Sequence, residues 1–332
     1  MSIDLAFIWA GIIAFAVLAY VMLDGFDLGL GILFPLFPDR ADRDRMMNSV
    51  APVWDGNETW LVLGGGGLLA AFPLAYAIVM PALYAPIIGM VLALVFRGVA
   101  FEFRWKTERG RRLWDWAFAG GSIIATLAQG IALGALVQGI PVIGRAYAGG
   151  WWDWLSPFSI VTGVALLVGY ALLGATWLIL KTDGALQLRA YRLAVVTGIA
   201  TAGFIIAVSL WTPFLEPIYM ARWFAFPQIL FTAPVPLLVA LCLLALFRGL
   251  AKRWEIVPFL ASQGLFLLSF IGIGISFYPY IVPPTLSIWD AAAPAASQRF
   301  LLIGTAPLVP LILAYTAYAY WVFRGKTGGF YR

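Results

Sequence analysis

Two acids interrupt a stretch that otherwise has the character of a lipid-facing helix. Residues 20–36 read Y-V-M-L-D-G-F-D-L-G-L-G-I-L-F-P-L and contain Asp24 and Asp27. Their spacing of three residues places both carboxylates on one face of a helix. A lone charge at the centre of a bilayer costs from about 2.5 to more than 10 kcal/mol. We therefore expect these acids to meet a cation, water or protons.

Further charged residues fall in the two apolar runs that follow. The block W-D-G-N-E-T-W begins the second run and carries Asp55 and Glu58, again three residues apart. The third run contains Arg97 and Glu102 near its end. A shared, partly hydrated interior would accommodate all these charges, and a wet carboxylate cluster can relay protons. The sequence predicts a proton pathway through Asp24, Asp27, Asp55 and Glu58, with Arg97 and Glu102 as charge partners.

Structural roles remain open for the same residues. Asp55 and Glu58 also fit a capping box, because D-x-x-E before an apolar run satisfies a helix N-terminus. Asp24 and Asp27 could serve only as ion-pair partners of a buried arginine. Gly25 and Gly29 form G-x-x-x-G, a spacing typical of close helix packing rather than of ligand binding.

The elements that must position these charges are membrane helices. The chain has 332 residues, of which 63% are hydrophobic and 11% charged, whereas soluble domains average about 25% charged residues. It has no histidine and one cysteine, Cys242, which excludes a disulfide framework. Histidine is the commonest haem ligand, so we expect this chain to bind no haem or metal of its own.

Nine runs are long enough to cross a bilayer, since a spanning helix needs about 20 apolar residues. The predicted spans are 7–34, 56–80, 81–104, 115–140, 158–180, 188–212, 227–248, 256–282 and 298–324. A tight hairpin is expected at Met80–Pro81. The first span lacks the basic flank and the cleavage site of a signal peptide, so we expect it to be retained.

The basic residues predict the orientation of these spans. Of the 21 Lys and Arg residues, 17 fall at alternate loops, at the adjoining helix ends or in the C-terminal tail, and the exceptions are Arg97, Arg145, Arg222 and Arg299. Loops rich in Lys and Arg face the cytoplasm. The net charge of +5 is thus a membrane signal and not one for nucleic acid. The N-terminus is predicted outside and the C-terminus in the cytoplasm.

A faint repeat suggests how the spans are grouped. Residues 96–100, F-R-G-V-A, resemble residues 247–251, F-R-G-L-A, although five similar letters can also arise by chance. A repeat of four spans predicts one all-α transmembrane domain, residues 1–332, built of two four-helix bundles and a ninth, peripheral helix. The expected divisions are residues 1–145, 146–290 and 291–332.

Several blocks together resemble a known family. L-D-G-F-D-L-G-L-G at 23–31, A-P-V-W-D-G-N-E-T-W-L at 51–61, Y-P-Y-I-V-P-P at 278–284 and L-S-I-W-D-A at 286–291 closely resemble subunit II of the bacterial cytochrome bd-type quinol oxidases. The resemblance runs in order from about residue 20 to 320, and the short length is similar to the cyanide-insensitive branch.

The resemblance implies a function and a set of partners. Enzymes of this family oxidise quinol and reduce oxygen to water, with haem b and haem d held by subunit I in the bacterial cytoplasmic membrane. Subunit II is expected to be haem-free, to support assembly, and to contribute to cytoplasmic proton delivery. The family's proton-path acid carries over to Asp55, and its paired acids to Asp24 and Asp27. Whether a structural quinone, lipid or a small single-span subunit binds this chain is left open.

Two other functions fit the same residues. A secondary transporter coupled to protons or sodium also uses intramembrane acids and internal repeats. A haem-bearing partner that copurifies with the chain would favour the oxidase, whereas solute uptake by a colourless homo-oligomer would favour transport. A scaffold with no proton role is the third alternative, and normal proton uptake after neutralisation of every acid named above would support it.

Overall fold

The computed structural model describes residues 4–327, so Arg332 of the predicted tail lies outside the described residues. Among those residues, eight helices are long and apolar enough to cross a membrane, and a bent pair provides a ninth candidate span. This confirms the prediction of an all-α membrane protein. The helices are α1 (Leu5–Leu33), α5 (Tyr84–Lys106), α6 (Arg111–Val137), α7 (Pro157–Lys181), α8 (Gly184–Trp211), α11 (Pro234–Ala251), α12 (Ile256–Phe277), α13 (Ala295–Val322), and the bent pair α3 (Trp54–Ala71) and α4 (Pro73–Ala82).

The second predicted span is broken rather than straight. Helices α3 and α4 meet at an angle of 119°, and Phe72 between them has the non-helical angles φ −133° and ψ 62°. Pro73 explains the break, because a proline disfavours helical geometry in the residue before it. The hairpin expected at Met80–Pro81 is therefore wrong: Pro81 lies inside α4, which ends at Ala82, and the chain turns at Leu83 into α5.

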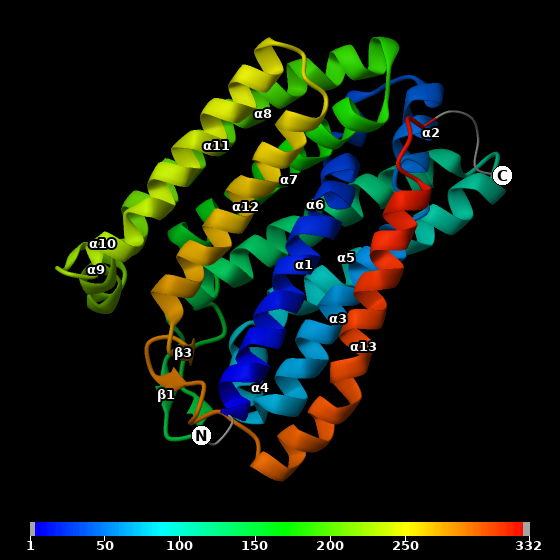
Figure 1. Cartoon of the computed structure of the whole chain (residues 1–332). Coiled ribbons are helices and arrows are strands. Elements are labelled where there is room, and N and C mark those ends of the chain that lie inside the picture. The colour runs from blue at the N-terminus through cyan, green and yellow to red at the C-terminus, as the bar shows by residue number, and fades with distance from the viewer. Residues whose placement is uncertain (1–3, 328–332) are drawn as a thin grey trace.

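Helix α1 lies at the centre of the helix packing (Figure 1). It contacts α3, α6 and α7, while α5 pairs with α6. The second half of the chain contributes α7, α8, α11 and α12, and α7 joins the two halves because it contacts both α6 and α12. Helix α13 lies against α3 and α1, and Gln298 is its one buried residue. The divisions at residues 145 and 290 remain a proposal.

Glycines allow α1 and α7 to cross at backbone contact. A Cβ atom added at Gly29 would lie 1.9 Å from the carbonyl oxygen of Tyr170, and one added at Gly174 would lie 2.4 Å from the carbonyl carbon of Gly29. A Cβ at Gly25 would lie 2.8 Å from the Tyr170 ring. No larger side chain fits without moving a helix, so the spacing of Gly25 and Gly29 fixes how α1 sits on α7.

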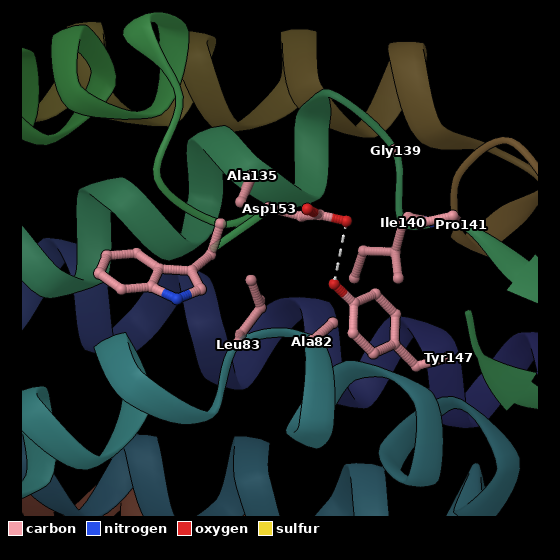
Figure 2. Close-up of a pocket in the computed structure, with 9 residues that line it drawn as sticks. Ala82, Leu83, Ala135, Gly139, Ile140, Pro141, Tyr147 and Asp153 are labelled. Carbon is pink, nitrogen blue, oxygen red and sulfur yellow. Dashed lines mark hydrogen bonds between the residues drawn. The ribbon is translucent and has the colours of Figure 1, made fainter. Parts of the chain in front are cut away.

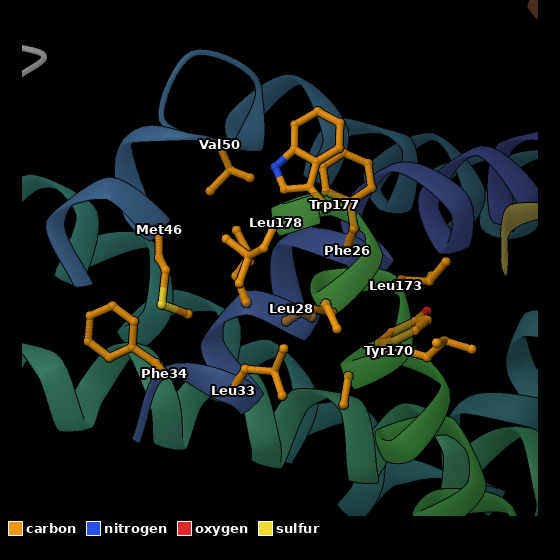
Figure 3. Close-up of a cluster of buried hydrophobic side chains, with 14 of the residues drawn as sticks. Phe26, Leu28, Leu33, Phe34, Met46, Val50, Tyr170, Leu173, Trp177 and Leu178 are labelled. Atoms are coloured by element: carbon orange, nitrogen blue, oxygen red, sulfur yellow. The ribbon is translucent and has the colours of Figure 1, made fainter. Parts of the chain in front are cut away.

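The main hydrophobic core surrounds the C-terminal half of α1 (Figure 3). Phe26 of α1 stacks on Trp177 of α7, with ring centroids 4.2 Å apart. Met46 and Met47 are fully buried in the same cluster. They come from α2 (Arg40–Asn48), a short helix that follows α1 and the turn η1 (Phe34–Leu36). This core holds the charged part of α1 rigidly between its neighbours.

Short elements close the two ends of the bundle. The end that carries α2 and the last turn of α13 holds the loops α5–α6, α7–α8 and α11–α12, and the opposite end carries small hairpins and short helices (Figure 1). These opposite-end elements are β1 (Val142–Ile143), β2 (Ala146–Tyr147), η2 (Thr212–Phe214), α9 (Pro217–Phe224), α10 (Ile229–Thr232), β3 (Tyr280–Val282) and β4 (Leu286–Ser287). The basic residues concentrate at the first end, which we propose to be cytoplasmic.

Two lysines hold residues 323–326 against the end of α7, and we call this pair of lysines with its hydrogen bonds the clasp. The Lys181 ammonium donates to the carbonyl oxygens of Phe323 and Gly325, and the Lys326 ammonium donates to those of Ile179 and Thr182. Lys181 is the last residue of α7, and Lys326 lies four residues beyond the end of α13 at Val322, so these bonds tie the ends of the two helices together. The clasp holds α13 in place at the end where its own packing is sparse.

Candidate functional site

The two acids of α1 are completely buried. Asp24 and Asp27 lie one helical turn apart, and both side chains have 0% exposure. Around them α1 is unbroken from Leu5 to Leu33. In a bilayer the backbone groups must be paired within the segment, and a continuous helix does this. Neighbouring helices therefore have to answer both charges.

Arg97 of α5 answers Asp24 directly. Its Nη1 and Nη2 atoms donate to Asp24 Oδ2 and Oδ1 at 3.0 and 2.7 Å. Such a two-pronged pair is the strongest arrangement that arginine and a carboxylate can make. Arg97 is itself fully buried, so neither partner has water as an alternative. This pair links α1 to α5.

Asp27 is held differently. Its Oδ2 lies 3.9 Å from Arg97 Nη2 and accepts a hydrogen bond from Asn57 Nδ2 at 2.7 Å. Its other oxygen, Oδ1, is buried without a hydrogen-bond partner in the described part of the chain. A free carboxylate oxygen inside a protein is costly unless a proton or a water molecule occupies it. Asp27 therefore has room for one more proton or water contact.

Glu58 of α3 connects this cluster to the surface. Its Oε2 lies 3.6 Å from Arg97 Nη1, and its side chain is 25% exposed. Three carboxyl groups thus surround one guanidinium. Full ionisation would leave two uncompensated negative charges in a largely buried site, so the charge balance favours retention of protons by the cluster. We call Asp24, Asp27, Glu58 and Arg97 the acid cluster.

Two predicted residues do not join the acid cluster. Glu102 was expected beside Arg97, but it is 65% exposed and pairs with Lys106 at 3.5 Å on the same helix. Asp55 is exposed in the first turn of α3. The capping box is also wrong, because α3 begins at Trp54 with Val53 as its N-cap and no side-chain cap. Asp55 lies one turn from Glu58, on the side toward the helix start.

The structure adds two residues that the sequence did not single out. Asn57 lies between Asp55 and Glu58 in the W-D-G-N-E block and is 1% exposed. Tyr320 comes from α13, and its hydroxyl donates to Asn57 Oδ1 at 2.9 Å. Its position between Asp55 and Glu58 could have identified Asn57 as a site residue from the sequence. Nothing in the sequence placed Tyr320, because it lies 263 residues away.

A second ionic network lies at the basic end of the same helices. Arg104 of α5 binds Asp44 and Asp115 at 2.7 and 2.5 Å, and Arg43 binds Asp115 at 3.1 Å. Arg111 binds Asp44 at 2.5 Å. These pairs join α2, α5 and the start of α6. In this network both carboxyls are paired on several sides, in contrast to the free oxygen of Asp27, so we assign it a structural role.

Two pockets in the described part of the chain lie outside the acid cluster. One, at the end with the β hairpins, is lined by Tyr147, Asp153 and Trp154 among others (Figure 2). Tyr147 donates to Gly150 O at 2.7 Å and to Asp153 Oδ2 at 3.3 Å. Burial raises the pKa of the Tyr147 phenol. The space measures about 20 Å³, which suits a single water and not a quinone ring.

The comparisons with known proteins decide the family. The sequence model described as cytochrome bd terminal oxidase subunit II matches residues 5–323.

The chain belongs to this family.

Similar relatives span nearly the whole chain. Cytochrome bd-I ubiquinol oxidase subunit 2 of Escherichia coli K12 is 31% identical over 97% of this chain and 95% of its own length. Cytochrome bd ubiquinol oxidase subunit 2 of Bacillus subtilis is 28% identical over 96% of each chain. The solved bd oxidase of Geobacillus thermodenitrificans matches with a TM-score of 0.77 at 18% identity, covering 97% of this chain and 99% of that one. That last likeness shows the fold alone.

Membership assigns this chain to an oxidoreductase complex. It is subunit II of a cytochrome bd quinol oxidase, a multi-pass protein of the bacterial inner membrane whose partner is subunit I. The sequence has no histidine, Met46 and Met47 are packed in the core, and no group of three His, Cys, Asp or Glu side chains within residues 4–327 is placed to hold a metal.

Proposed function

We propose that this subunit is haem-free, supports assembly, and delivers protons from the cytoplasm to oxygen chemistry carried out by haem b and haem d in subunit I. The observation that carries the proposal is the free buried oxygen of Asp27 beside the partly exposed Glu58. In the structural network, by contrast, Asp44 and Asp115 are each paired with two arginines. A proton relay needs a carboxyl group with an open position between two neighbours.

The proposed route begins at Asp55. This acid is exposed at the basic end of α3, and Glu58 lies one turn deeper, within reach of Arg97. Asp27 and Asp24 come next, at 3.9 and 2.7 Å from the same guanidinium nitrogen. Arg97 keeps the negative charge of the site low as protons pass. The electrons and the oxygen remain with the partner subunit throughout.

The resemblance supports the remaining parts of the proposal. Quinol would release its protons on the outer side, and the protons consumed with oxygen would enter from the cytoplasm, which makes the enzyme electrogenic without a pump. A small third subunit, bound lipid and a structural quinone are compatible with this scheme. Helix α13 and the outer faces of α8 and α11 carry exposed apolar side chains that such partners could cover.

The test uses the intact two-subunit complex with Asp27→Asn and Asp55→Asn. Both variants keep the size of the side chain and remove its proton. We expect normal haem content with a turnover lowered about tenfold or more for Asp27→Asn, in line with the loss of one proton-transfer group. Full haem content with wild-type proton-coupled turnover in Asp27→Asn would refute the relay, and the same result in Asp55→Asn would remove Asp55 from the route.

A further inference from the structure

The hydroxyl group of Tyr320 links helix α13 to the acid cluster through Asn57. Tyr320 donates to Asn57 Oδ1 at 2.9 Å, and Asn57 Nδ2 donates to Asp27 Oδ2 at 2.7 Å and to the carbonyl oxygen of Leu23 at 3.3 Å. The chain of bonds therefore runs from α13 through α3 to α1. The hydrogen-bonded route from the phenol to the carboxylate passes through the amide of Asn57.

The amide of Asn57 can face Asp27 in two ways. With Nδ2 toward Asp27, it donates to a carboxylate, as observed. Turned over, its oxygen would face Asp27 Oδ2 and Leu23 O, and only a protonated Asp27 could satisfy it by donating. The two orientations thus suit the two protonation states of the acid.

We infer that Tyr320 is a positioning residue that holds the Asn57 amide in the orientation matched to ionised Asp27. Its hydroxyl donates to Oδ1, and the carbonyl oxygen of Leu23, which can only accept, binds Nδ2, so the two contacts together hold Nδ2 toward the acid. The inference rests on the proposed function, because it assigns Tyr320 a role only if Asp27 gains and loses protons.

The surroundings make the hydroxyl well placed for this role. The Tyr320 ring lies 6.4 Å from the Trp177 ring in an edge-on arrangement, which holds the ring beside α7. The clasp formed by Lys181 and Lys326 secures the chain a few residues further on. Tyr320 is therefore fixed from two sides, whereas the outer face of α13 is exposed.

The decisive variant is Tyr320→Phe in the intact complex, with rates expressed per haem. It removes the hydroxyl and keeps the ring. We expect the maximal rate to fall roughly three- to tenfold with the quinol KM unchanged, less than the effect of losing a hydrogen bond made directly to a charged group. The infrared band of a protonated carboxyl group that disappears in Asp27→Asn is assigned to Asp27. In Tyr320→Phe this band should persist to higher pH than in the wild-type complex. Tyr315→Phe, on the exposed face of the same helix, is the matched control.

A double-mutant cycle with Asn57→Ala separates the possible outcomes. If Tyr320 acts through Asn57, then Tyr320→Phe has no further effect on rate or infrared band in the Asn57→Ala complex. The inference is overturned if the effects of the two substitutions are additive, or if Tyr320→Phe alone leaves the rate and the band unchanged. In either case the proposed function still stands, provided that Asp27→Asn impairs turnover. A wild-type turnover in Asp27→Asn would instead refute the proposed function itself.

Discussion

At the scale of single residues, the protein separates two uses of a buried carboxyl. Asp24 is fully engaged by Arg97, with both oxygens bonded. Asp27 keeps one oxygen free. The two acids lie one turn apart on the same helix, so their difference comes from the partners that α3 and α5 supply. We assign Asp24 mainly to holding the helices and Asp27 mainly to proton transfer.

The first prediction concerns the Asp24–Arg97 pair. Asp24→Asn should destabilise the subunit by about 3–5 kcal/mol, because it leaves a buried guanidinium without its two-pronged partner. The readout is the thermal unfolding midpoint of the purified complex. Adding Arg97→Gln should recover part of the loss, since the unpaired guanidinium is then gone and the remaining carboxyl groups of Asp27 and Glu58 can be neutralised by protons. A wild-type midpoint in Asp24→Asn, or additive losses in the double variant, would contradict this reading.

At the scale of helices, close approach and end contacts position the acid cluster. The α1–α7 crossing depends on Gly29 and Gly174, which place two backbones in contact. The position of α13 depends on the clasp around Lys181 and Lys326. Neither feature forms a hydrogen bond to the acids, so we expect changes in Gly29 or in the clasp to affect assembly first.

The second prediction tests the helix crossing. Gly29→Ala should cost about 1–3 kcal/mol or prevent assembly, since overpacking forces a shift of the backbone. Gly65→Ala in α3 is the control, because nothing lies within 4 Å of a Cβ added there. Yield of haem-loaded complex and its thermal midpoint are the measurements. Equal behaviour of the two variants would show that the crossing tolerates a methyl group.

The third prediction gives the clasp a pH dependence. Hydrogen bonds from Lys326 and Gln187 lower the pKa of Glu255 below its ordinary value of 4.5. The stabilisation that ionised Glu255 contributes to the clasp is thus complete above about pH 4.5 and disappears as pH falls through the lowered pKa. An exposed ion pair contributes at most about 1 kcal/mol, so the effect should be modest.

Hydrogen–deuterium exchange of residues 323–327 measures this contribution. Glu255→Gln should speed exchange a few-fold relative to wild type at pH 7, and the ratio of the two rates should approach one as the pH drops below 4.5. Glu108→Gln, an exposed acid in the loop between α5 and α6, should leave the ratio at one. A ratio independent of pH would indicate that the Glu255 charge plays no part.

At the scale of the whole molecule, composition and apolar length were sufficient for the fold class. They were not sufficient for the break at Phe72, since Pro73 can either begin a new helix or be absorbed within one. Of the site, Asp24, Asp27, Glu58 and Arg97 were predicted and lie together. Glu102 was misplaced because its face of α5 points outward, and Tyr320 was missed because only tertiary packing brings α13 to α3.

The fourth prediction concerns orientation. Basic loops indicate that the end with α2 and the last turn of α13 faces the cytoplasm. In a Cys242→Ser background, Arg145→Cys should react with a membrane-impermeant maleimide on intact spheroplasts. Glu108→Cys should react only after the membrane is opened. The reverse pattern would invert the direction of the proposed proton path.

The most direct test of the relay is proton uptake during a single turnover. The reduced complex is mixed with oxygen while a pH indicator follows the protons and the haem absorbance follows the chemistry. With Asp27→Asn, we predict that proton uptake slows about tenfold or more and that the haem steps needing protons slow with it, at full haem content. Uptake at the wild-type rate in that variant would contradict the assignment of Asp27 as the buried proton carrier.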